Sequence, residues 1–117
     1  MITFYGYKKC STCRKAEQVL SKAGVAYNFV DITQEPPSAT TIKKVALQAQ
    51  RTLRQMFNTS GVVYREKKIK DRVADLTDNE IGSLLAEDGR LIKRPIVTDG
   101  SRSTVGFTPD EFTKTWR

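Results

Sequence analysis

"ITFYGYKKCSTCRKAEQVL", residues 2–20, joins a strand pattern to a helix pattern and holds both cysteines of the chain between them. Residues 2–6 are rich in strand-forming side chains and end on glycine, which predicts a first strand. From Ser11 onward, apolar residues recur at helical spacing and Gly24 ends the pattern, which predicts a helix. A CxxC pair directly between a strand and a helix is typical of dithiol redox motifs.

The rest of the chain predicts further strands on both sides of a long helical stretch. Residues 25–32 predict a second strand, so the first third of the chain reads as a βαβ unit with two parallel strands. A helical insertion is expected over approximately 38–88, and a hairpin with a turn at Asp99-Gly100 follows it. The order βαβ, helical insertion, ββα predicts one α/β domain over 1–117 with a mixed four-stranded sheet.

Several helix ends in this stretch carry their own signals. Ser38 is a predicted cap, and Thr77 with Glu80 forms a predicted capping box. A separate helix is expected over about 66–74. Thr108, which precedes a proline, is the predicted cap of a last helix.

Composition excludes several kinds of chemistry. The 117-residue chain has no histidine, which excludes Ser-His-Asp and Cys-His catalysis and any histidine-ligated metal. Two thiols fall short of the four ligands of a structural zinc, so no metal site is predicted. No apolar run approaches a bilayer span, and Lys8 and Lys9 follow the first apolar stretch, whereas the charges of a signal peptide precede it. We therefore expect a cytoplasmic protein without membrane contact, whose thiols stay reduced.

The net charge of +7 raises the question of a nucleic-acid partner. The densest basic run is "YREKKIKDR", residues 64–72. Glu66 and Asp71 interrupt it, and charge alone carries no means of reading a base sequence. We interpret the run as a solvated helix face and expect no direct DNA binding.

The position of the cysteines predicts different roles for them. Cys10 would lie at a helix N-terminus, where free amide groups and the helix dipole favour a thiolate, and Cys13 one turn later. We predict that the pKa of Cys10 lies well below the roughly 8.5 of a free thiol. Cys13 would be the buried resolving thiol. Two buried thiols, or half of an intermolecular metal site, are the alternatives. Four flanking basic residues are expected to add to the thiolate's stability: Lys8, Lys9, Arg14 and Lys15.

Three segments together resemble a known family. "FYGYKKCSTCRKAEQVL", then "IKRPIV" (residues 92–97), then "VGFTPDEF" are similar to the glutaredoxin-linked arsenate reductase family and its Spx and YffB-like relatives. The resemblance runs from Ile2 to Trp116. It implies a thioredoxin-like fold with a helical insertion, which agrees with the order of the predicted elements.

The resemblance also implies roles for single residues. Cys10 matches the family's catalytic cysteine, Pro95 matches the proline that is cis in thioredoxin-like folds, and Arg94 matches an arginine of the arsenate site. Ser11 and Thr12, between the cysteines, complete the predicted substrate-binding residues with Arg94 and Pro95.

The chain departs from the arsenate reductases at several positions. Two of their three oxyanion-binding arginines are absent, since one falls near Asn58 and the other near Phe107. The histidine upstream of the cysteine is missing, and Cys13 supplies a local second thiol where the reductases use glutathione. Asn and Phe cannot rebuild a guanidinium clamp, so these departures argue against efficient arsenate reduction.

Three functions follow from the sequence. The first is a thiol–disulfide oxidoreductase with Cys10 as nucleophile and Cys13 as resolving thiol. The alternatives are an Spx-type redox-sensing transcription regulator that binds RNA polymerase, and a glutathione-dependent arsenate reductase. We expect a monomer with no bound cofactor, a thiol or disulfide substrate, and glutathione or a thioredoxin or glutaredoxin system as electron donor.

Overall fold

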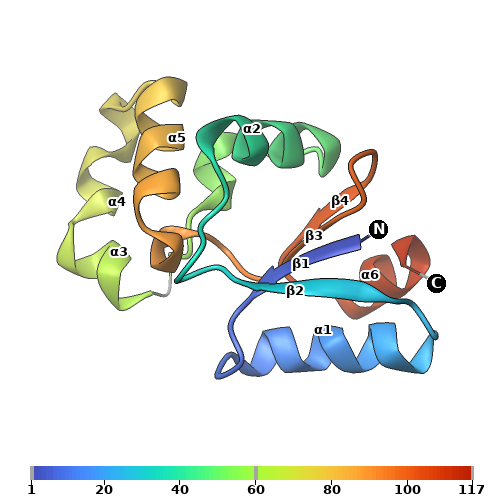
Figure 1. The fold of residues 1–117 in the computed structure, drawn as a ribbon. Coiled ribbons are helices and arrows are strands. Elements are labelled where there is room, and N and C mark those ends of the chain that lie inside the picture. Colours follow the sequence, from blue (N-terminus) through green and yellow to red (C-terminus); the bar gives the residue numbers. More distant parts are fainter. Residues whose placement is uncertain (1, 60, 117) are drawn as a thin grey trace.

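A mixed four-stranded sheet forms the centre of the protein in the computed structural model, which describes residues 2–59 and 61–116 (Figure 1). The strand order is β2-β1-β3-β4; β1 pairs parallel with β2 and antiparallel with β3, and β3 pairs antiparallel with β4. This confirms the predicted fold class. The strands are β1 (Ile2–Gly6), β2 (Tyr27–Asp31), β3 (Ile96–Thr98) and β4 (Ser103–Val105).

Helices cover both faces of this sheet. Figure 1 shows α1 and α6 on one face, α2 on the other, and α3 to α5 grouped beyond the end of the strands. The α-helices are α1 (Ser11–Lys22), α2 (Ala39–Gln48), α3 (Val62–Glu66), α4 (Ile69–Arg72), α5 (Asp78–Glu87) and α6 (Pro109–Thr115). Three 3-10 helices lie among them: η1 (Leu53–Met56), η2 (Val73–Asp75) and η3 (Gly89–Leu91).

The sheet separates two hydrophobic cores, because successive side chains of a strand point to opposite faces. Phe4 and Val97 face the smaller core, which is closed by α1 and α6 and also contains Cys13. Ile96 and Val105 face the larger core, which is built by the helices between β2 and β3. The helices between β2 and β3 therefore pack together with one face of the sheet around the larger core.

Helix α1 ends in a Schellman motif at Gly24, the residue at which the sequence predicts the helix to end. Gly24 has a φ of +71°, a left-handed conformation that glycine adopts without steric cost. The amide of Val25 donates to the carbonyl of Leu20 at 3.0 Å, and that of Gly24 donates to Ser21 at 3.1 Å. The turn leads directly into β2, which is shorter than the predicted strand 25–32.

All three predicted cap residues occupy N-cap positions, but only two of them make a side-chain capping hydrogen bond. The Ser38 hydroxyl accepts from the amide of Thr41 at 3.2 Å. Thr77 and Glu80 form the full capping box, with reciprocal hydrogen bonds of 3.2 and 3.0 Å. Thr108 is the N-cap residue of α6 but makes no side-chain capping hydrogen bond, and Pro109 follows it at the start of the helix.

Thr77 makes a capping hydrogen bond and Thr108 makes none, which gives a prediction about stability. We expect Thr77→Ala to lower the free energy of unfolding by about 1 kcal/mol, because it leaves an amide of the first turn of α5 without its partner. Thr108→Ala is the matched control and should cost clearly less. Urea denaturation of both variants measures the difference, and equal losses would contradict it.

The helix predicted over 66–74 forms over a shorter range: α4 (Ile69–Arg72) begins later than predicted, and η2 (Val73–Asp75) follows it directly. Helix α3 ends at Glu66, and Lys68 adopts a left-handed conformation with a φ of 52°. A left-handed residue cannot continue a right-handed helix, so the chain turns and begins α4 at Ile69, which is buried. The turn places Ile69 in the larger core, a tertiary contact that the charged sequence around it did not reveal.

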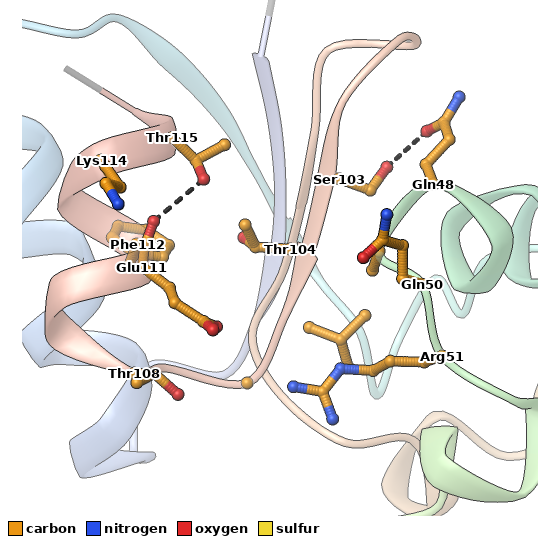
Figure 2. Close-up of a pocket in the computed structure, with 13 residues that line it drawn as sticks. Gln48, Gln50, Arg51, Ser103, Thr104, Thr108, Glu111, Phe112, Lys114 and Thr115 are labelled. Carbon is orange, nitrogen blue, oxygen red and sulfur yellow. Dashed lines mark hydrogen bonds between the residues drawn. The ribbon is translucent and has the colours of Figure 1, made fainter.

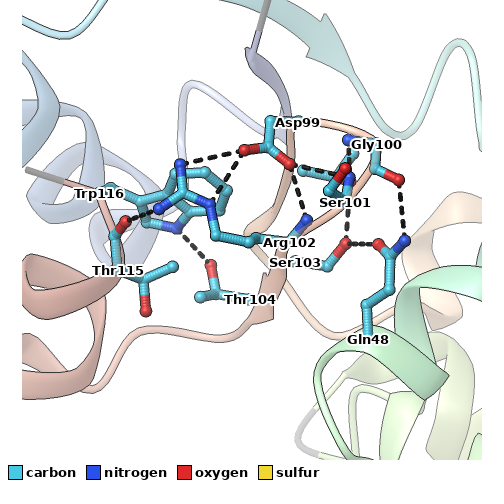
Figure 3. A network of polar contacts seen from close by, with 10 residues as sticks. Gln48, Asp99, Gly100, Ser101, Arg102, Ser103, Thr104, Thr115 and Trp116 are labelled. Carbon is cyan, nitrogen blue, oxygen red and sulfur yellow. Dashed lines mark hydrogen bonds and ion pairs between the residues drawn. The ribbon is translucent and has the colours of Figure 1, made fainter.

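Polar contacts attach the hairpin to the C-terminal helix (Figure 3). Arg102 pairs with Asp99 at 3.0 Å across the turn, and its guanidinium lies 5.0 Å from the centre of the Trp116 ring. The indole of Trp116 donates to the hydroxyl of Thr104 at 2.9 Å. Hydrogen bonds from the amides of Arg102 and Ser101 lower the pKa of Asp99 to about 2.

Candidate redox site

Cys10 occupies the N-cap position of α1. Its backbone is extended, with a φ of −86° and a ψ of 118°, and its carbonyl accepts the first helical hydrogen bond from Arg14 at 3.1 Å. The amide of Cys10 donates to the carbonyl of Tyr7 at 3.0 Å, which closes the loop after β1. The side chain is half-buried and its thiol is free. A reacting molecule can therefore reach it from the end of the helix.

Cys13 lies one turn further along α1 and is fully buried. Its sulfur packs where Gly6 ends β1: a Cβ at this glycine would lie 3.2 Å from the Cys13 Sγ and closer still to the Phe4 ring. The missing side chain thus leaves room for the sulfur beside the strand. Cys13 is a free thiol inside the smaller core, beside the exposed end of the helix that carries Cys10.

The two thiols have pKa values shifted in opposite directions. Partial burial raises the pKa of Cys10, but hydrogen bonding from the amide and thiol of Cys13, the charge of Arg94 and the amide of Thr12 together lower it below its ordinary value. Burial, with the hydrogen bond and charge of Cys10, raises the pKa of Cys13 to about 12. The predicted direction for Cys10 therefore agrees with the structure.

The source of the positive charge differs from the predicted one. The charge of Lys8 is engaged with other groups: its ammonium pairs with Glu17 at 3.0 Å and lies 4.0 Å from the centre of the Phe29 ring. Tyr27 donates to the same carboxylate oxygen at 2.8 Å. The charge that lowers the pKa of Cys10 most is that of Arg94, which reaches the site from the other end of the chain.

Arg94 lies directly before β3, at a cis peptide bond to Pro95. Its guanidinium lies 5.6 Å from the centre of the Tyr7 ring, in the loop that leads to the cysteines. Because β3 is the neighbour of β1, the sheet brings this residue to the start of α1. The structure thus brings together Cys10, Cys13 and Arg94, as the resemblance implied.

The role of Arg94 can be tested by titration. We expect Arg94→Gln to raise the pKa of Cys10, because removing a nearby positive charge disfavours the thiolate. The pH midpoint of the iodoacetamide reaction should then move to higher pH. Arg14→Gln, which removes an exposed flanking charge, is the control and should shift the midpoint less. A midpoint that responds equally to both variants would refute the special position of Arg94.

A cleft of about 330 Å³ adjoins this site on the side of Arg94. We call it the Arg94 cleft. Asn58 lines it, at the position where the resemblance placed an oxyanion-binding arginine. Phe107, at the other such position, packs against Phe112 with 5.1 Å between ring centres. The residues that line the cleft include Tyr7, Asn58, Val62, Glu66, Arg90 and Arg94.

A second cleft, of about 260 Å³, lies between the end of α2 and the elements β4 and α6 (Figure 2). Figure 2 shows Arg51, in the loop that follows α2, on one side and Glu111 of α6 on the other. None of its lining residues belongs to the CxxC segment or to the Arg94 cleft. We therefore place the candidate chemistry at the cysteines.

The other predicted substrate-binding residues belong to two segments, the first turn of α1 and the chain just before β3. Ser11 is exposed and Thr12 half-buried in the first turn of α1, and Pro95 is buried at the entry to β3. Sequence reasoning missed Tyr7 and Gly6. Their position, between the first strand and the CxxC pair, was the one signal that the sequence offered for them.

Within 2–59 and 61–116, no group of three or more metal-binding side chains comes together. Over the same residues no helix has the length and apolar character that crossing a bilayer requires.

The sheet, the helical insertion and the cysteine at the start of α1 define a protein of the thioredoxin-like class. The model of the ArsC family matches residues 5–115, nearly the whole chain. The chain belongs to the ArsC family, which confirms the resemblance to the arsenate reductases and their relatives.

Known proteins of this family are similar to the chain along almost their full length. The uncharacterized protein YusI of Bacillus subtilis is 44% identical over 115 residues, 98% of each chain. The global transcriptional regulator Spx 1 of Lactococcus lactis is 29% identical over 95% of this chain and 85% of its own. Among solved structures, a possible arsenate reductase from Streptococcus mutans has a TM-score of 0.84 and 40% identity, covering 92% of this chain and 91% of that one.

Proposed function

We propose that this protein is a thiol–disulfide oxidoreductase that works through a reversible disulfide between Cys10 and Cys13. The observation that carries the proposal is the opposite shift of the two pKa values within one helical turn. A thiol with a lowered pKa is a thiolate more often than an ordinary cysteine at the same pH and so attacks disulfides more readily, whereas a buried thiol with a raised pKa stays protonated.

The proposed reaction begins with attack of the Cys10 thiolate on a substrate disulfide. This forms a mixed disulfide and releases one substrate thiol. The negative charge on Cys10 then disappears, and with it two of the contributions that raise the pKa of Cys13. Cys13 can now lose its proton and attack the Cys10 sulfur, which releases the second thiol. Glutathione or a thioredoxin or glutaredoxin system would restore the dithiol.

The surrounding residues have supporting roles in this proposal. Arg94 favours the Cys10 thiolate, and Pro95 fixes Arg94 to β3. Ser11 and Thr12, at the exposed end of α1, contact the substrate next to the thiol. Their position around Cys10 supports these roles.

A single-turnover experiment tests the function. The reduced protein is mixed with bis(2-hydroxyethyl) disulfide, an uncharged substrate, and the released thiol is quantified. We expect two thiols per chain, and peptide mass spectrometry should find Cys10 linked to Cys13. Thiol release no faster than with protein alkylated at both cysteines would reject the proposal.

A regulator of the Spx type is the second candidate. The similarity to Spx 1 over nearly the whole chain favours it, and a CxxC switch fits a redox sensor as well as an enzyme. Such a regulator should bind RNA polymerase with an affinity that changes when Cys10 and Cys13 are oxidised. Absence of binding in both redox states would remove this candidate.

Arsenate reduction is the weaker enzymatic alternative. Asn58 stands in the Arg94 cleft where the resemblance places an arginine, and Arg90 is already paired with Asp88 at 2.9 Å. Arg94 alone would have to hold the oxyanion. We expect little glutathione-dependent arsenate turnover. Clear turnover by the wild-type protein that disappears in Arg94→Gln would support arsenate reduction instead.

A further inference from the structure

We propose that the Arg94 cleft recognises a small zwitterionic disulfide, whose carboxylate lies toward Arg94 and whose ammonium group lies toward Glu66. This inference rests on the redox function proposed above and names its substrate class. Cystine is the simplest molecule of this kind.

The position of the cleft connects it to the reacting thiol. Tyr7 forms part of its wall, and the carbonyl of Tyr7 accepts the hydrogen bond from the amide of Cys10 at 3.0 Å. Arg94 lies against the Tyr7 ring and its charge acts on Cys10. A molecule in the cleft would therefore extend toward Cys10.

The charges that line the cleft are of both signs, and they are not equally available. Arg90 is held by Asp88 through two hydrogen bonds of 3.1 and 2.9 Å, so its charge is already compensated. Arg94 and Glu66 form no ion pair with any residue that the structure describes. The cleft thus offers one available cation and one available anion.

These two charges lie at different parts of the cleft. Arg94 is on the side of Tyr7 and the cysteines. Glu66, at the end of α3, is exposed and lies near enough to Arg90 for its charge to act on that guanidinium. The carboxylate and the ammonium group of an amino-acid disulfide leave one α-carbon in different directions, so one can lie toward Arg94 and the other toward Glu66.

Val62 gives the cleft an apolar surface. It is one of the two large hydrophobic side chains with high exposure among the described residues, at 56%. It begins α3, between Asn58 and Glu66, and lines the cleft. The methylene group between the α-carbon and the sulfur of an amino-acid disulfide would cover it from water.

Other charge patterns fit this cleft less well. A doubly negative disulfide would be attracted by Arg94 but repelled by Glu66. A doubly positive disulfide would be attracted by Glu66 but repelled by Arg94. An inorganic oxyanion would find one free guanidinium and a carboxylate. Only a ligand that carries both charges satisfies both side chains, because each available charge then has an opposite partner.

The chemical step is the disulfide exchange proposed above. The Cys10 thiolate forms a bond to one sulfur of R–S–S–R, and the S–S bond breaks to release RS⁻. Cys13 loses its proton to water, bonds to the Cys10 sulfur and releases the second RS⁻. The substrate gains two electrons and takes up two protons to become two thiols, and the protein is oxidised to a disulfide that an external dithiol reduces.

A comparison of two substrates tests the inference. Cystine and 3,3′-dithiodipropionate have the same carboxylates and sulfurs, but only cystine carries ammonium groups. We measure the ratio of their second-order rate constants with reduced wild-type protein and with Glu66→Gln. The ratio in favour of cystine should fall about fivefold in the variant, the effect of losing one partly exposed charge pair.

Glu111→Gln is the matched control, since it removes the same charge from α6, in the other cleft (Figure 2). It should leave the ratio as in the wild type. An unchanged ratio in Glu66→Gln, or an equal fall in both variants, would overturn the inference while the redox function stands.

If the protein reduces no disulfide at all, including the uncharged one, the proposed function fails. A ligand-binding experiment then tests the zwitterion site independently of the redox reaction. S-methylcysteine and 3-(methylthio)propionate are then titrated into the Cys10→Ser variant and followed by NMR. Amide shifts at Asn58 and Val62 with S-methylcysteine that weaken on adding Glu66→Gln would support the zwitterion site. Equal shifts with both ligands, or none with either, would overturn it.

Discussion

Replacing Cys10 by serine is expected to reduce disulfide-reducing activity to the uncatalysed background. A serine hydroxyl is not ionised near neutral pH and forms no disulfide, so the first step cannot occur. Cys13 cannot substitute, because it is fully buried, and burial, the largest cause of its raised pKa, remains when Cys10 is replaced. The rate of thiol release from bis(2-hydroxyethyl) disulfide measures the loss.

Cys13→Ser separates the two roles. The first attack by Cys10 remains, so one thiol should be released rapidly and the mixed disulfide on Cys10 should accumulate. Intact-mass spectrometry detects this adduct. Full turnover in Cys10→Ser would overturn the assignment of the nucleophile, and two thiols released by Cys13→Ser without an added thiol would overturn that of the resolving cysteine.

The largest expected loss of stability comes from Gly89→Ala. Gly89 begins η3 and is buried. A Cβ there would overlap the carbonyl oxygen of Ile32 and lie 2.6 Å from its carbonyl carbon. Ile32 follows β2 and its amide donates to Gly6 at 2.9 Å, so the obstacle is backbone fixed at the end of the sheet. We expect the free energy of unfolding to fall by about 3 kcal/mol or more.

Gly82→Ala is the control for this prediction. Gly82 is inside α5, and a Cβ there would lie 3.5 Å from Ala39 Cβ and Lys43 Cε, an ordinary contact. Since alanine favours a helix by about 1 kcal/mol over glycine, this variant should be slightly more stable than the wild type. Thermal denaturation followed by circular dichroism compares them. A Gly89→Ala protein that melts within about 2 °C of the wild type would refute the close packing at η3.

Local patterns determined most of the fold. The order of elements, the end of α1 at Gly24 and the capping box at Thr77 each depend on residues a few positions apart, and the structure confirms them. The helix expected over 66–74 begins later than predicted, because Lys68 turns the backbone and places Ile69 in the core. Thr108 carried the right residue type for a cap but lacks the hydrogen bond.

The sequence by itself determined that two cysteines share the first turn of a helix after a strand, because that depends on spacing alone. Only the tertiary structure decided which positive charge acts on Cys10. The flanking lysines and arginines are close in sequence, yet Lys8 pairs with Glu17, further along α1. Arg94 comes close because β3 pairs with β1, a contact between distant segments that no local pattern encodes. Electrostatic effects follow distance in space, so the sheet pairing determines the environment of the thiol.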